Sequence, residues 1–101
     1  MSTISPNELK EKLAANQPVT VIDIRESWEY EEEHIEGPNI PMHEIPGRLA
    51  ELEPLREQDV VLYCNTGDRS GTALAVLKQY GFTRVWSLEG GIVAWKAHKT
   101  S

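Results

Sequence analysis

The chain has 101 residues, of which 40% are hydrophobic and 26% charged, and its formal net charge is −6. This length suits one compact domain over residues 1–101, while the negative charge argues against nucleic acid or an anionic membrane as a partner. The single cysteine, Cys64, excludes an internal disulfide and fits no zinc-binding spacing. Because the start shows no apolar leader and no run of about 20 apolar residues follows, we expect the protein in the cytoplasm. We also expect a monomer.

The first half of the chain predicts an edge strand, a buried strand and several helices. Ser5 to Glu8 forms a capping box, and Pro6 suits the first helical position of the helix that follows. The stretch 19–24 is rich in β-branched residues and nearly continuous in apolar character, which is typical of a parallel strand buried on both faces. The other elements expected here are a short helix over 27–33, an extended piece at 39–41 and a helix within 46–55.

The second half predicts a strand, a long helix, a strand and a final helix. The strand at 59–63 is strongly apolar, and the helix over about 70–80 ends at Gly81, a residue suited to a C-terminal cap. A strand at 84–88 and a helix after Gly90-Gly91 complete the chain. Strands that alternate with helices predict a three-layer α/β fold, in which helices flank a central, mostly parallel sheet of five strands.

The loop between the strand at 59–63 and the next helix has the composition of a reactive site. Cys64 lies at the carboxyl end of a strand, where ligands bind in open α/β sheets, and the first turn of the next helix stabilises an anion there. Gly67 lets loop amides turn inward, Arg69 adds a cation, and Ser70 can cap the helix. A buried structural thiol is the alternative, but the polar residues 65–70 favour a nucleophilic thiolate.

Four segments together make the chain resemble the rhodanese family over nearly its whole length. They are Asp23-Ile24-Arg25-Glu26 with Glu29-Tyr30, His34 to Gly37 with Asn39-Ile40-Pro41, the loop from Tyr63 to Ser70, and Leu88 to Gly91 with Ala94-Trp95. Each segment is a weak signal by itself, but their common order and spacing are specific. The segment Gly37-Pro38-Asn39 is one residue shorter than the family pattern, which changes a loop near the site.

The resemblance implies a sulfurtransferase without a metal or an organic cofactor. Cys64 would be the catalytic residue: it would take a sulfane sulfur from thiosulfate or a persulfide donor, hold it as a persulfide, and pass it to a thiophilic acceptor such as cyanide or a thiol. The partners would be a small-molecule donor and acceptor, with a protein acceptor left open. The substrate-binding residues implied by the loop are Asn65, Thr66, Gly67, Asp68, Arg69 and Ser70.

Two other functions stay open at this point. Cysteine-dependent phosphatases and arsenate reductases also place Cys and Arg on a strand–loop–helix, but four residues separate Cys64 from Arg69, one fewer than that class uses. A non-enzymatic binding module is the second alternative, although inactive family members usually lack the cysteine. The side chain of Asp68 either faces solvent or pairs with Arg69, or it faces the pocket and disfavours thiosulfate.

Polar residues outside the loop have mainly structural interpretations. The acidic run Glu29 to Glu33 is expected to be a solvated helix face. Asp23 and Arg25 are expected to form a structural ion pair under the loop, with a role in organising the site as the alternative. His34 is expected to be a turn residue, because a thiolate nucleophile needs no separate base.

Overall fold

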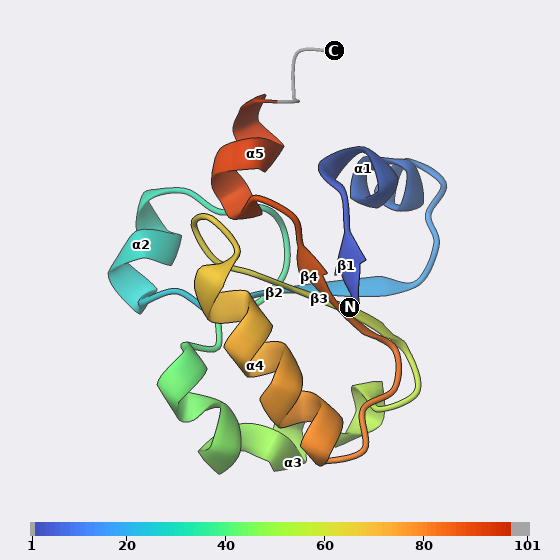
Figure 1. Cartoon of the computed structure of the whole chain (residues 1–101), viewed down its shortest axis with the longest axis vertical. Helices are drawn as coiled ribbons and strands as arrows, with labels where there is room; N and C mark the ends of the chain where they lie inside the picture. Colours follow the sequence, from blue (N-terminus) through green and yellow to red (C-terminus); the bar gives the residue numbers. More distant parts are fainter. Residues whose placement is uncertain (1, 98–101) are drawn as a thin grey trace.

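Four parallel strands form the central sheet of the computed structural model, which describes residues 2–97 apart from the side chain of Asp68 (Figure 1). The strands are β1 (Thr3–Ile4), β2 (Val19–Asp23), β3 (Asp59–Tyr63) and β4 (Val85–Leu88), in the order β1-β4-β3-β2. β2 and β3 pair over their full length, from Val19 opposite Asp59 to Asp23 opposite Tyr63. Their carboxyl ends therefore lie side by side, which brings Asp23 close to the start of the loop at Cys64.

Helices cover both faces of the sheet and confirm the predicted three-layer arrangement (Figure 1). The helical segments are α1 (Pro6–Ala14), α2 (Ser27–Glu32), η1 (Met42–Arg48), α3 (Leu49–Leu52), η2 (Glu53–Leu55), α4 (Asp68–Gln79) and α5 (Gly91–Ala97), where η marks a 3₁₀ helix. Alternate residues of β3 face opposite sides: Leu62 packs with η1, α3 and α4, whereas Val61 packs with α1 and α5. The near-continuous apolar strands are explained by this burial on both faces.

The expected fifth strand at 39–41 is wrong: the sheet has four strands. Asn39 forms a single parallel bridge with Asp23, and the Ile40 amide donates to the Asp23 carbonyl at 2.8 Å. Pro38 and Pro41 enclose this segment, and neither has an N–H group to extend a ladder. The helix expected within 46–55 is likewise divided into η1, α3 and η2, because Pro46 and Pro54 interrupt its hydrogen bonding.

Two predicted helix ends are confirmed in detail. The Ser5 hydroxyl accepts a hydrogen bond from the Glu8 amide at 3.1 Å, and the Glu8 carboxylate accepts one from the Ser5 amide at 2.9 Å. Gly81 follows α4 with φ +91°, a left-handed conformation that favours glycine. In the described part of the chain, no helix is long and apolar enough to cross a membrane.

Candidate active site

Cys64 sits at the carboxyl end of β3, and its sulfur meets the loop that leads into α4. The Gly67 amide donates a hydrogen bond to Cys64 Sγ at 3.1 Å. Gly67 can aim its amide this way because it adopts φ +105°, which other residues reach only with strain. Cys64 is only 1% exposed and packs with the apolar cluster below α4, so its thiol is buried and receives a hydrogen bond from the Gly67 amide.

Two buried serines lie behind the sulfur. Ser70 Oγ is 3.9 Å from Cys64 Sγ, 3.0 Å from the Gly67 carbonyl oxygen, and 2.5 Å from Ser87 Oγ. The expectation that Ser70 caps α4 is wrong, because Gly67 occupies the cap position and Ser70 bonds back to it from the first turn. Since a carbonyl can only accept, the Ser70 proton goes to the Gly67 carbonyl, and the Ser70 oxygen then accepts from Ser87 and from the Cys64 thiol. Sequence reasoning missed Ser87, whose only signal was a serine within an apolar strand.

The beginning of α5 holds the loop from the other side of the sheet. The Ile92 amide donates to the Cys64 carbonyl at 2.9 Å, and the Val93 amide donates to the Asn65 carbonyl at 3.1 Å. Gly91, with φ +60°, allows this approach, because a Cβ atom there would lie 2.3 Å from the Cys64 carbonyl oxygen. The Gly90-Gly91 pair therefore bends the chain before the last helix and also allows the first amides of α5 to hydrogen-bond to the main chain of the loop.

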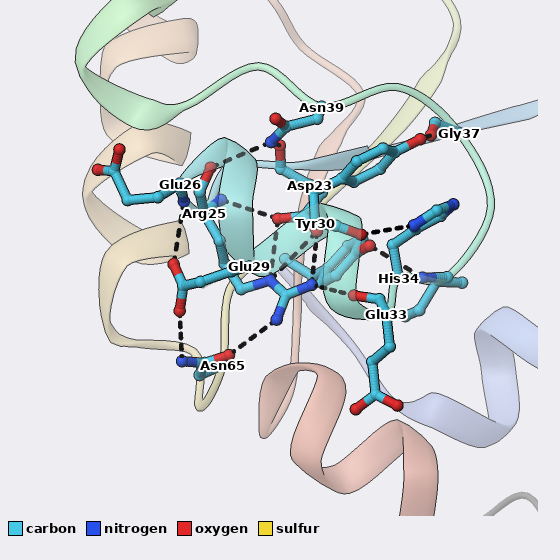
Figure 2. A network of polar contacts seen from close by, with 12 residues as sticks. Asp23, Arg25, Glu26, Glu29, Tyr30, Glu33, His34, Gly37, Asn39 and Asn65 are labelled. Atoms are coloured by element: carbon cyan, nitrogen blue, oxygen red, sulfur yellow. Dashed lines mark hydrogen bonds and ion pairs between the residues drawn. The ribbon is translucent and has the colours of Figure 1, made fainter.

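A buried ion pair supports the loop next to Cys64 (Figure 2). Arg25 Nη2 donates to Asp23 Oδ2 at 2.8 Å, and both residues are buried. Burial works to lower the pKa of Arg25, but the hydrogen bond and charge of Asp23 outweigh it, and the pKa stays raised. Arg25 Nη1 also donates to Asn65 Oδ1 at 3.1 Å, so the expected structural pair has the organising role as well.

Glu29 contacts the loop that follows Cys64, although the sequence predicts it to lie on a solvated helix face. Its side chain is 12% exposed, whereas Glu31 and Glu32 of the same run are exposed as expected. Glu29 Oε2 accepts from Asn65 Nδ2 at 3.0 Å, and Glu29 Oε1 lies 3.4 Å from Arg69 Nη1 (Figure 2 shows the contact with Asn65). Burial works to raise the pKa of Glu29, but hydrogen bonds from the Glu26 amide, Arg69 and Asn65 hold it below its usual value.

The remaining expected residues lie in different surroundings. Thr66 is exposed at the tip of the loop, and the Asp68 side chain lies outside the described residues, so both of its orientations stay predictions. His34 stacks on Tyr30 with ring centroids 3.8 Å apart, and its Nδ1 lies 2.8 Å from the Tyr30 carbonyl oxygen, as suits a turn residue. Across residues 2–97, leaving aside the side chain of Asp68, no three His, Cys, Asp or Glu side chains come together in a metal-binding group.

An open groove borders the loop on its α4 side. Gly67 and Ser87 line it together with Gly71 and Leu74, and its volume is about 290 Å³. Gly67 therefore contacts the sulfur with its amide and borders open space as well. The loop is thus bounded by the main-chain contacts to α5 on one side and by this groove on another.

Comparisons with known proteins connect this geometry to one family. The sequence profile of the rhodanese-like domain matches residues 5–98. A sulfurtransferase from Allochromatium vinosum is 39% identical over 99 residues, which cover 97% of this chain and 91% of that protein. The thiosulfate sulfurtransferase PspE of Escherichia coli is 39% identical over 70 residues, covering 68% of this chain and 67% of PspE. The crystal structure of a rhodanese-related protein from Thermoplasma volcanium superposes with a TM-score of 0.86 at 31% identity, covering 98% of this chain and 94% of that one.

Proposed function

Because the chain belongs to the rhodanese-like domain family, we propose that it is a sulfurtransferase in which Cys64 carries the transferred sulfur as a persulfide. The observation that carries this proposal is the Gly67 amide, 3.1 Å from Cys64 Sγ at the carboxyl end of a parallel strand. An amide that donates to sulfur favours its anionic form, which is the nucleophilic one. A catalytic group at this edge of the sheet also suits the general placement of sites in open α/β folds.

The reaction proceeds in two displacement steps at sulfur. In the first, the Cys64 thiolate attacks the outer sulfur of thiosulfate, the bond between the two donor sulfurs breaks, and sulfite leaves with the electron pair. In the second, an acceptor such as cyanide attacks the outer sulfur of the Cys64 persulfide, and the thiolate is restored as thiocyanate leaves. Each step exchanges one bond at sulfur for another, so no outside oxidant or reductant enters, and one difficult transfer becomes two easier ones.

The loop residues have distinct roles in this scheme. The Gly67 amide is the described donor to the sulfur and would stabilise its negative charge, whereas the Ser70 oxygen accepts from the neutral thiol. Asn65 fixes the loop through Arg25 and Glu29 rather than through the sulfur. We propose that Thr66, which is exposed at the tip of the loop, meets the incoming donor or acceptor.

The substrates in the proposal are a thiosulfate or persulfide donor and a cyanide or thiol acceptor, including a protein thiol. The name of PspE, thiosulfate sulfurtransferase, supports thiosulfate as one donor. The short spacing from Cys64 to Arg69 and the relatives named sulfurtransferase argue against a phosphatase. A free thiol that must stay reduced between turnovers suits the cytoplasm.

Intact mass spectrometry tests the proposal directly. Incubation with thiosulfate is expected to add the mass of one sulfur atom to the protein, and cyanide is expected to remove it with release of thiocyanate. Cys64→Ser should not load, while Ser27→Ala, at an exposed position, is the control that should load as the wild type does. Loading of the Cys64→Ser variant, or hydrolysis of a phosphate ester by a protein that accepts sulfur from no donor, would contradict the proposal.

A further inference from the structure

Glu29 connects α2 to both ends of the loop that follows Cys64. One carboxylate oxygen accepts from Asn65 Nδ2 at 3.0 Å, and the other lies 3.4 Å from Arg69 Nη1. The Glu26 amide donates to the latter oxygen at 2.9 Å and fixes the carboxylate at the start of α2. The largely buried Glu29 is therefore held in place, whereas Arg69, whose side chain is 35% exposed, is the partner with room to move.

The described arginines beneath and beside the loop each form an ion pair with a carboxylate, which neutralises their charge. Arg25 is bound to Asp23, and Arg69 is bound to Glu29. The two described arginines that contact the loop residues or Glu29 are thus each matched by an anion at close range. An anionic sulfur donor that approaches Cys64 meets the Gly67 amide, but it must compete with Glu29 for the guanidinium of Arg69.

Donor charge matters in this reaction because the nucleophile is itself an anion. Thiosulfate carries two negative charges, so its encounter with the Cys64 thiolate gathers three on the reacting group. Methanethiosulfonate delivers the same outer sulfur with one charge fewer, and its leaving group is methanesulfinate instead of sulfite. From the proposed function and these contacts together, we infer that Glu29 is a specificity-determining residue: it neutralises Arg69 and biases Cys64 toward sulfur donors of low negative charge.

The test compares these two donors in Glu29→Gln and in a matched control. Glu32→Gln makes the same change of charge at an exposed position of the same helix. The measured quantity is kcat/KM for thiosulfate divided by kcat/KM for methanethiosulfonate, because general damage to the loop affects both donors and cancels in the ratio. If the removed charge and the bound donor are taken to be about 8 Å apart, such a ratio changes by roughly twofold to thirtyfold for effective dielectric constants between about 80 and 20.

We expect Glu29→Gln to raise the ratio about fivefold, mostly through a lower KM for thiosulfate, and Glu32→Gln to leave it within about twofold of the wild type. Arg69→Gln should lower the ratio, which keeps the inference testable if the Glu29 variant fails to fold. An unchanged ratio in Glu29→Gln, or an equal rise in Glu32→Gln, would overturn the inference while sulfur still loads on Cys64. Absence of loading from either donor in the wild type would instead overturn the proposed function, and the inference with it.

Discussion

Replacing Gly91 by alanine should detach the loop that follows Cys64 from α5. Gly91 has φ +60°, and a Cβ atom there would lie 2.3 Å from the Cys64 carbonyl oxygen and 2.4 Å from that of Asn65. Real Cβ atoms do not approach main-chain oxygens so closely, so the helix start and the loop must separate. The hydrogen bonds from the Ile92 and Val93 amides to these two carbonyls, at 2.9 and 3.1 Å, are the contacts that this separation breaks.

The free-energy cost follows from these contacts. A non-glycine residue in the left-handed region costs about 1–2 kcal/mol. Each lost main-chain hydrogen bond costs about 1 kcal/mol, and more where a carbonyl is left buried without a partner. We therefore expect Gly91→Ala to lower the free energy of unfolding by about 3–4 kcal/mol. Gly71→Ala is the control: it lies inside α4, nothing lies within 4 Å of its added Cβ, and helix propensity predicts a gain of up to about 1 kcal/mol.

Urea denaturation of both variants measures these differences, and sulfur loading by mass spectrometry measures the effect on the site. The loading rate of Gly91→Ala should fall at least about tenfold under conditions in which the variant is folded, because the Cys64 main chain has moved. A Gly91→Ala protein with wild-type stability, or one that is destabilised but loads at the normal rate, would refute the idea that α5 positions the loop.

The remaining predictions concern the ion pair and the serines. Asp23→Asn leaves the Arg25 guanidinium buried without its counter-ion, and it should lower the free energy of unfolding in urea by about 3–5 kcal/mol. The control, Asp59→Asn, removes a carboxylate whose arginine partner is half-exposed, and it should lower the free energy by about 1 kcal/mol or less. Equal losses in the two variants would contradict the buried-pair argument. Ser87→Ala removes the hydroxyl that donates to Ser70, so the rate of loading from thiosulfate should fall about threefold to tenfold with little loss of stability, and an unchanged rate would show that Ser87 is only a packing residue.

Features encoded within a short stretch of sequence were predicted well. The capping box at Ser5, the buried strands at 19–24 and 59–63, and the cap at Gly81 all depend on neighbours a few residues away. The position of Cys64 at a strand-to-helix junction follows from the same local patterns. The layer arrangement then follows from the alternation of strands and helices, which leaves few ways to bury two apolar faces.

Features that depend on distant partners were predicted less well. Glu29 was assigned to a solvated face because its sequence neighbours are acidic, but Asn65 and Arg69, far along the chain, remove it from solvent. Ser87 gave no signal that it would meet Ser70. A fifth strand was predicted because residues 39–41 are extended. An extended segment joins a sheet only if its N–H groups face the neighbouring strand, and prolines have no N–H group.

The arrangement of charge in this site indicates where its reactivity comes from. Each described arginine near the loop is already paired with a carboxylate, so the cations mainly fix the loop and contribute little net attraction. The described donor to Cys64 Sγ is the Gly67 amide, and its direction is set by the left-handed turn at Gly67 and by the contacts of the loop to α5. In the proposed reaction, an amide held in this way would stabilise an anion at low cost, because it needs no reorganisation as charge shifts from the thiolate to the outer sulfur. The rate of the transfer should therefore depend on the backbone of the loop, and the choice of donor on the charged side chains around it.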